Sequence, residues 1–270
     1  MISLYDPPEQ REAIAPAIAF GKGTGHRLPV MNILRKLGLI GPKKHDREAL
    51  EIYNERIGST RLTERDGVKV VDYRKADGSF DYEAYKAIQT AANKAKIDWR
   101  SVQPENIAFL CHALTERGVK IRKVLCHGTR NGAEQKFFHE ATGAEVLGTE
   151  ISDTATQFPM TIQWDFHEVK PEWQGAFDVI FSNSWDHSYD PKLALSRWLT
   201  CIAKGGALAL EWSNVHGKTE ASPIDPFRSN LPELISLLET LVANSEFSKP
   251  EVIPLPDNDR EKLFIAVFRK

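Results

Sequence analysis

Residues Lys123 to Ile151 read KVLCHGTRNGAEQKFFHEATGAEVLGTEI, and this stretch decides the fold. It begins with a short apolar run, Val124 to Cys126, of the length and type expected for a buried strand. A glycine-containing turn follows, then an amphipathic helix that stops at Gly143, and a second apolar run reaches Ile151. Strand, turn, helix and strand within about 30 residues make one βαβ unit, which predicts two parallel strands.

The turn and the end of the second run carry the features of a cofactor site. Gly128 and Gly132 flank the turn, where a missing side chain lets the backbone approach a ligand. Glu150 lies about 20 residues beyond the turn, where a carboxylate can accept hydrogen bonds from ribose hydroxyls. The unit therefore predicts a site for an adenosine-containing cofactor at the carboxyl ends of parallel strands.

A helix is expected at 104–117, and from Ile121 onward the chain alternates between strand and helix patterns, with further helices expected at 190–203 and 231–243. The expected strands are 121–126, 145–151, 161–166, 177–183, 206–212, 251–256 and 262–270. The last two are joined by a short polar turn, which only neighbouring antiparallel strands can share. The pattern predicts an α/β fold with a doubly wound, mostly parallel seven-stranded sheet and a C-terminal antiparallel hairpin. NAD-binding folds of this kind normally end in a parallel strand, so the hairpin argues against NAD.

The first hundred or so residues have a different pattern. Helices are expected at 9–20, 30–40, 46–57 and 81–97, and a hairpin at 60–74. The glycine-rich segment GKGTG, 21–25, has no strand before it, so we interpret it as a loop or part of a lid. We predict two domains: a mainly helical N-terminal cap or substrate region with a β-hairpin, 1–103, and a cofactor-binding domain, 104–270.

Composition favours an ordinary globular protein. Charged residues make up 27% of the chain and the formal net charge is −2, so no global field indicates a nucleic acid or a membrane. No apolar run approaches the roughly 18 residues needed to span a bilayer. Cys111, Cys126 and Cys201 lie far apart among apolar neighbours, which predicts buried free thiols and a reducing, cytoplasmic compartment.

Five stretches, taken in order, carry a resemblance to a known family. They are VLCHGTRNG, VLGTEIS, IQWDFHE, FDVIFSNSWDHSYDP and LTCIAKGGALALEW. With the closing hairpin they resemble the class I S-adenosylmethionine (SAM)-dependent methyltransferases, over about residues 107–270, and among these the small-molecule and sugar types. The resemblance implies a Rossmann-like domain that binds SAM, releases S-adenosylhomocysteine and transfers a methyl group.

The family's first motif resembles VLDLGCGTG, and this chain departs from it at two positions. Gly128 and Gly132 match its outer glycines, but Arg130 stands at the middle glycine. Cys126 stands where many members have an acid that helps to hold the methionine part of SAM. Arg130 is expected either to bind the methionine carboxylate or to point into solvent.

Two further acids carry over from the resemblance. Glu150 matches the acid that binds the ribose, with a solvated strand end as the alternative. Asp165 matches the acid that takes the adenine amino group, and its alternative is to cap the next loop. The cofactor residues that the resemblance implies are Gly128, Thr129, Arg130, Gly132, Glu150, Ile151, Asp165, Phe166, Ser182 and Asn183.

The segment SNSWDH, 182–187, resembles a motif of small-molecule members and supplies the catalytic candidate. His187 is expected to act as general base, because an imidazole that titrates near neutral pH can remove a hydroxyl or amine proton. Asp186 and His216 are the supporting candidates. These three and Glu211 could also surround a divalent cation, but their spacing does not require one, and no metal is predicted.

The resulting hypothesis is a cytoplasmic SAM-dependent transferase, an O-methyltransferase by preference, with a small-molecule or sugar acceptor. Two alternatives stay open. A basic cluster is interpreted as a solvated helix face or as a docking surface for a phosphate-bearing substrate, such as a nucleotide-sugar or an RNA end. Its members are Lys22, His26, Arg27, Arg35, Lys36, Lys43, Lys44, His45 and Arg47. The second interpretation leaves an RNA or other macromolecular acceptor open. The departures at Cys126 and Arg130 keep a non-catalytic SAM-binding protein open. The oligomeric state is not fixed by the sequence, and a homodimer is compatible with it.

Overall fold

A computed structural model describes residues 43–65, 67–218, 220–256 and 261–270. The chain divides into two compact units, Met1–Pro42 and Lys43–Lys270, and all described residues belong to the second. The helices expected at 9–20 and 30–40, the GKGTG loop and the basic residues between 22 and 36 lie outside the described part. The division of the chain at residue 103 stays a prediction.

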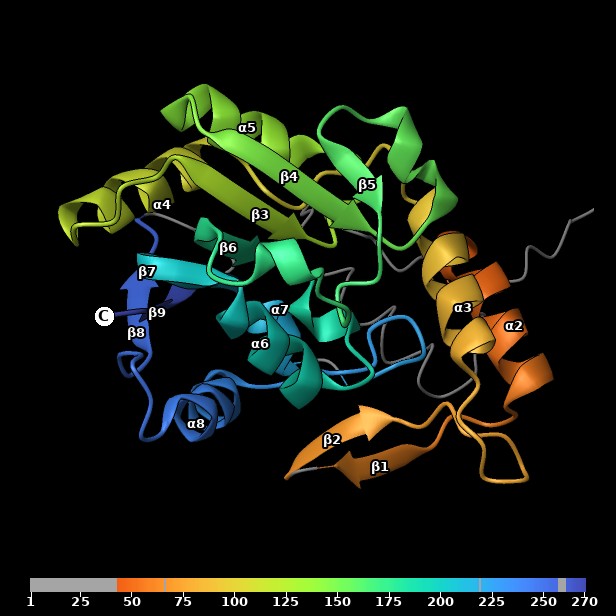
Figure 1. Ribbon diagram of the computed structural model, residues 1–270. Coiled ribbons are helices and arrows are strands. Elements are labelled where there is room, and N and C mark those ends of the chain that lie inside the picture. The colour runs from red at the N-terminus through yellow and green to blue at the C-terminus, as the bar shows by residue number, and fades with distance from the viewer. Residues whose placement is uncertain (1–42, 66, 219, 257–260) are drawn as a thin grey trace, which may run out of the picture. The chain divides into compact units, whose positions relative to one another are not determined.

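Seven strands form one sheet in the order β5-β4-β3-β6-β7-β9-β8 (Figure 1). Their bounds are β3 Lys123–His127, β4 Glu145–Glu150, β5 Thr161–Gln163, β6 Phe177–Ser182, β7 Ile202–Trp212, β8 Glu251–Pro254 and β9 Leu263–Phe268. Strands β3 to β7 pair in parallel, whereas β9 is antiparallel to both β7 and β8. The predicted fold class is confirmed, and β9 is its one reversed strand.

Two strand boundaries differ from the expected ones by more than two residues. The third strand ends at Gln163 rather than at Phe166. The reason is local, because the Asp165 carboxylate accepts a hydrogen bond from the His167 backbone N–H, which turns the chain. Strand β7 begins at Ile202, four residues earlier than expected, and passes through Gly205 and Gly206 before its buried run.

Helices cover both faces of the sheet (Figure 1). Val124 and Cys126 of β3 pack with the apolar side chains of α4 (Pro104–Glu116) and α5 (Ala133–Thr142). Leu125, between them, faces the opposite way and packs with α6 (Pro191–Thr200) and α8 (Leu231–Val242). The central strands are therefore apolar on both faces, as expected for parallel strands between two helical layers.

The segment before α4 packs around a small core that also includes Ile224. It contains η1 (Lys44–Asp46), α2 (Arg47–Arg56), the antiparallel pair β1 (Leu62–Arg65) and β2 (Val68–Val71), and α3 (Tyr82–Lys94). Asp81 begins α3, because its side chain accepts a hydrogen bond from the Ala84 N–H and pairs with Arg56. Tyr85 and Gln89 then connect α3 to the backbone at His187 and Ile224, beyond the carboxyl ends of the sheet.

The remaining elements are short: η2 (Asp153–Gln157), η3 (Pro171–Trp173), η4 (Trp185–His187) and α7 (Asn214–Lys218). Among the described residues, no helix has the length and apolar character to cross a membrane. Cys111, Cys126 and Cys201 are all free and buried, as the sequence predicted.

Candidate functional site

The turn after β3 depends on backbone conformations that favour glycine. Gly128 has φ +72°, and a Cβ placed there would lie 2.7 Å from the Ser184 Cβ, so both the conformation and the space exclude a side chain. Gly132 has φ +74°. Arg130, at the position of the family's middle glycine, has φ +44°. It therefore keeps the left-handed conformation although it has a side chain, at a cost of about 1–2 kcal/mol.

Glu150 ends β4 and is held by the turn. One carboxylate oxygen accepts a hydrogen bond from the Arg130 N–H at 3.0 Å, and the other accepts one from the Ser152 N–H at 2.9 Å. Only 6% of the residue is exposed, and burial raises the pKa of its carboxyl group. The side chain is thus fixed in place by backbone donors.

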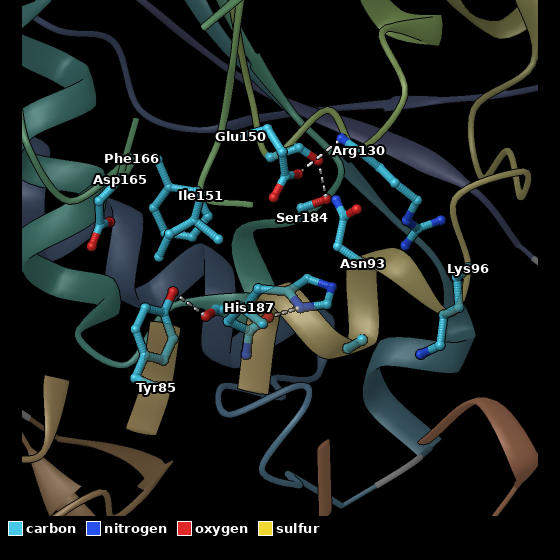
Figure 2. A pocket seen from close by; sticks show the side chains of 13 residues that line it. Tyr85, Asn93, Lys96, Arg130, Glu150, Ile151, Asp165, Phe166, Ser184 and His187 are labelled. Atoms are coloured by element: carbon cyan, nitrogen blue, oxygen red, sulfur yellow. Dashed lines mark hydrogen bonds between the residues drawn. The ribbon is translucent and has the colours of Figure 1, made fainter. Parts of the chain in front are cut away.

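A cavity of about 530 Å³ opens beside Glu150 (Figure 2). Figure 2 shows Glu150 and Arg130 at one side, with Tyr85 and His187 at the other. We call this cavity the main pocket. The residues that line it are Tyr85, Gln89, Ala92, Asn93, Lys96, Gly128, Arg130, Glu150, Ile151, Asp165, Phe166, Ser184 and His187.

A smaller pocket of about 240 Å³ continues from the main pocket. The two share Gly128, Arg130 and Ser184, and the smaller one adds Trp99, Arg100, Ser101, Thr129, Asn131, Glu134 and Asn183. The Asn131 side chain donates to the carbonyls of Ile97 and Trp99, at 2.8 Å and 3.1 Å. The glycine turn therefore binds the segment that follows α3 and forms one wall of this side pocket with it.

Asp165 lines the main pocket but also organises its own loop. One oxygen accepts from the backbone N–H and the Nδ1 of His167, and the other accepts from the Tyr82 hydroxyl at 2.9 Å. The Nε2 of His167 in turn lies 2.7 Å from the Ser188 hydroxyl. Burial would raise the pKa of Asp165, but the hydrogen bonds and charge of His167 outweigh burial and lower it. The carboxylate thus caps the loop, the alternative that the sequence left open for it.

His187 reaches the main pocket from η4, and its neighbours define its tautomer. The Gln89 amide nitrogen donates to the Ile224 carbonyl, so the amide oxygen faces the His187 Nδ1 at 3.0 Å. An amide oxygen can only accept, which places the ring proton on Nδ1. The lone pair of the neutral ring is then on Nε2, which lies 3.8 Å from Asp186 and 3.6 Å from Asp225.

His216 lies in the same charge cluster but has a different arrangement. Its Nδ1 accepts a hydrogen bond from the Ser213 N–H at 2.9 Å, and its Nε2 lies 3.7 Å from Asp186. Burial lowers its pKa, with Asp186 acting in the opposite direction. The lone pair of the neutral ring is therefore already used, which makes His216 a poorer base than His187.

Asp186, His187 and Asp225 bring three possible metal-ligand atoms within 4.8 Å of one another. Arg228 belongs to the same cluster, paired with Asp225 and with its Nε 4.0 Å from Asp186. One guanidinium thus already neutralises part of the acidic charge, so charge balance does not call for a metal. Glu211, a possible ligand in the sequence, pairs with Lys262.

The structure brings most of the expected site residues to the two pockets. Gly128, Arg130, Glu150, Ile151, Asp165, Phe166 and His187 line the main pocket, and Thr129 and Asn183 line the side pocket. Ser182 is fully buried and donates to the His127 carbonyl instead. Gly132, Asp186 and His216 line neither pocket.

Sequence reasoning missed the contribution of α3. Tyr85, Gln89 and Asn93 follow one another at intervals of four, so they share one face of the helix and reach the main pocket. The sequence signal that could have indicated this contribution is the pair of amide side chains, Gln89 and Asn93, on an otherwise apolar helix face. Sequence reasoning also missed Glu134, Asp225 and Arg228, and it did not single out Ser184 within the SNSWDH segment.

No protein-family model and no curated protein matches the sequence. Solved structures do match. A Burkholderia thailandensis 1,6-didemethyltoxoflavin-N1-methyltransferase, with bound 1,6-didemethyltoxoflavin and S-adenosylhomocysteine, is 15% identical with a TM-score of 0.51, over 78% of this chain and 99% of that one. The plantazolicin methyltransferase BpumL, in complex with S-adenosylhomocysteine, is 11% identical with a TM-score of 0.51, over 70% and 91%. The chain has the fold of class I SAM-dependent methyltransferases.

Proposed function

We propose that this protein is a SAM-dependent methyltransferase that acts on a hydroxyl or amine of a small-molecule or sugar acceptor. The observation that carries the proposal is Glu150, a buried carboxylate at the end of β4 that still lines the main pocket. Around it stand the glycine turn and the apolar side chains of Ile151 and Phe166. SAM supplies an electrophilic methyl group when it is bound.

Glu150 is suited to hold a ribose. Each of its oxygens accepts one backbone hydrogen bond and keeps further acceptor capacity for a hydroxyl group. Ile151 and Phe166 offer apolar surfaces to an adenine ring, and Asp165 can accept from the adenine amino group with the oxygen that Tyr82 contacts. The smaller side pocket, beyond Arg130, is left for the amino-acid end of the cofactor.

His187 is the proposed general base. It lines the main pocket, and the lone pair on its Nε2 is free of the Gln89 hydrogen bond. A proton taken up there lies beside the carboxylates of Asp186 and Asp225. Most of the rate enhancement would come from holding acceptor and methyl group close and in line, since methyl transfer requires no protein nucleophile.

A small acceptor is favoured because α3 borders the main pocket with the side chains of Tyr85, Gln89 and Asn93. The names of the two structural neighbours give didemethyltoxoflavin and plantazolicin as what those proteins methylate or modify. An RNA acceptor would instead require the basic cluster near the N-terminus. A steep loss of acceptor affinity with added salt would favour RNA over a small molecule.

The decisive experiment is calorimetry with S-adenosylhomocysteine and NAD on the whole chain. We expect S-adenosylhomocysteine to bind and NAD not to bind. Glu150→Ala should weaken S-adenosylhomocysteine on the order of 10- to 100-fold, because hydrogen bonds to a buried charged group are lost. Glu145→Ala is the matched control, since Glu145 lies exposed at the other end of β4. Binding of NAD without S-adenosylhomocysteine would refute the proposal.

A further inference from the structure

Glu134 is a buried carboxyl group with an unused acceptor atom. It is the second residue of α5 and is 6% exposed. Its Oε2 is buried and accepts no hydrogen bond from any of the described residues. The same residue lines the side pocket. Because burial of an unpaired carboxylate is costly, its position at a pocket indicates a ligand that brings a donor or a positive charge.

The groups around Glu134 leave its charge unbalanced. Burial raises its pKa to about 7, the charge of Arg130 opposes this rise, and those of Glu211 and Glu150 add to it. The two neighbouring cations are turned elsewhere, since an Arg130 guanidinium nitrogen donates to the Trp99 carbonyl and Lys262 pairs with Glu211. The lining of the side pocket contains the buried acid Glu134 together with Arg100 and Arg130.

Glu134 also interacts electrostatically with Cys126, the position at which many members of the resembled family have an acid. After burial, the charge of Glu134 is the main influence that raises the pKa of the Cys126 thiol. Cys126 lies inside β3, whereas Glu134 comes from the first turn of the helix that follows. A carboxyl group missing from the strand is thus present nearby on the helix.

We propose that Glu134 binds the α-ammonium group of the amino-acid end of SAM, in place of an acid at position 126. The assignment rests on the proposed function. The side pocket shares Gly128 and Arg130 with the main pocket, and Arg130 lies on the side of Glu150 away from Ile151 and Phe166 (Figure 2). An α-amino acid carries one positive and one negative group, which a buried acid and nearby arginines complement.

The test compares two ligands by calorimetry. S-adenosylhomocysteine carries the amino-acid end, and 5′-methylthioadenosine has the same adenosine and thioether without it. Glu134→Gln should weaken S-adenosylhomocysteine on the order of 10- to 100-fold and change 5′-methylthioadenosine by less than about twofold. Glu140→Gln, an exposed site on the same helix, should change neither.

A second measurement on the wild-type chain covers the case in which Glu134→Gln does not fold. Ammonium binding favours the carboxylate, so S-adenosylhomocysteine should bind up to about tenfold more weakly for each pH unit below 7, with release of a proton. Glu150, Glu211, Cys126, Arg130 and Lys262 also face this region. The contribution of Glu150 is shared by 5′-methylthioadenosine, which should lack the additional proton release.

The outcomes separate the assignment from the function. If wild type binds S-adenosylhomocysteine and Glu134→Gln binds it equally well, the assignment is wrong and the proposed function stands. Equal weakening of both ligands by Glu134→Gln also overturns the assignment, because the loss would then be structural. If wild type binds neither ligand, the proposed function fails and the assignment fails with it.

Discussion

The glycine turn after β3 and the histidine cluster around η4 border the same pocket, but different kinds of contact hold them. Glu150 is fixed by the backbone N–H groups of Arg130 and Ser152. His187 is fixed by the Gln89 side chain and lies beside the carboxylates of Asp186 and Asp225. A substitution at the turn should therefore act through conformation and cofactor binding, whereas one in the cluster should act through charge and chemistry.

His187→Asn should have the largest effect and should leave the turn intact. Removal of a general base lowers transfer by about 10²- to 10⁴-fold. The affinity for S-adenosylhomocysteine should change by less than about threefold, because the contacts of Glu150 persist. Release of S-adenosylhomocysteine with a panel of hydroxyl and amine acceptors measures the first quantity, and calorimetry measures the second. His112→Asn, at an exposed histidine, is the control. Unchanged transfer would rule out the base assignment.

Gly128→Ala should destabilise the glycine turn after β3. The alanine would have to keep an unfavourable left-handed backbone conformation, and its Cβ would lie 2.7 Å from the Ser184 Cβ. Together these effects should lower the free energy of unfolding by about 3 kcal/mol. Gly143→Ala isolates the conformational part, because Gly143 has φ +70° and open space around its Cβ, and it should cost only about 1 kcal/mol. Equal losses in denaturant unfolding would mean that Ser184 simply moves aside.

A smaller effect, on the pH dependence of stability, should come from His127, which ends β3 next to the glycine turn. Burial lowers the pKa of His127 to about 3, while a histidine in the unfolded chain titrates near 6.5. Between these values the unfolded chain holds a proton that the folded chain lacks, so stability falls as the pH drops through this window. From pH 7.5 to pH 5 this contribution should be about 2 kcal/mol.

His127→Phe tests that contribution, because it keeps the ring stacked on Trp198 and removes the titration. Unfolding free energies measured across this pH range should depend less on pH in the variant than in wild type. Other buried groups, such as His216, contribute equally to the pH dependence of both proteins, so their contribution cancels when the variant is compared with wild type. A pH dependence that is the same in both would show that His127 is not buried in its neutral form.

The contrast between the glycine turn and the histidine cluster also explains what the sequence could predict. The turn, Glu150 and Ile151 come from one stretch of about 30 residues with a fixed spacing, so pattern and resemblance located them together. The mostly parallel sheet followed from the alternation of strand and helix, and the reversed β9 followed from the short turn before it. These features depend on residues that are near one another in the chain.

The histidine cluster could not be predicted in the same way. It joins Gln89 from α3, Asp186 and His187 from η4, and Asp225 and Arg228 from a loop that no pattern defined. Their meeting depends on tertiary packing, which spacing in a sequence does not report. Asp165 is a related case, since its hydrogen bonds with Tyr82 and His167 could not be told from a ligand contact by position alone.

The buried cysteines have a practical consequence for labelling chemistry. The chain has three thiols, all buried, and burial raises the pKa of Cys111 to about 12 and of Cys201 to about 11. Because the thiolate is the reactive form, the folded protein should be almost inert to maleimides. Glu83→Cys, on the exposed side of α3, would then accept a single fluorophore without removal of any native cysteine. Such a probe would report, in real time, how the helix that borders the pocket responds when a ligand enters.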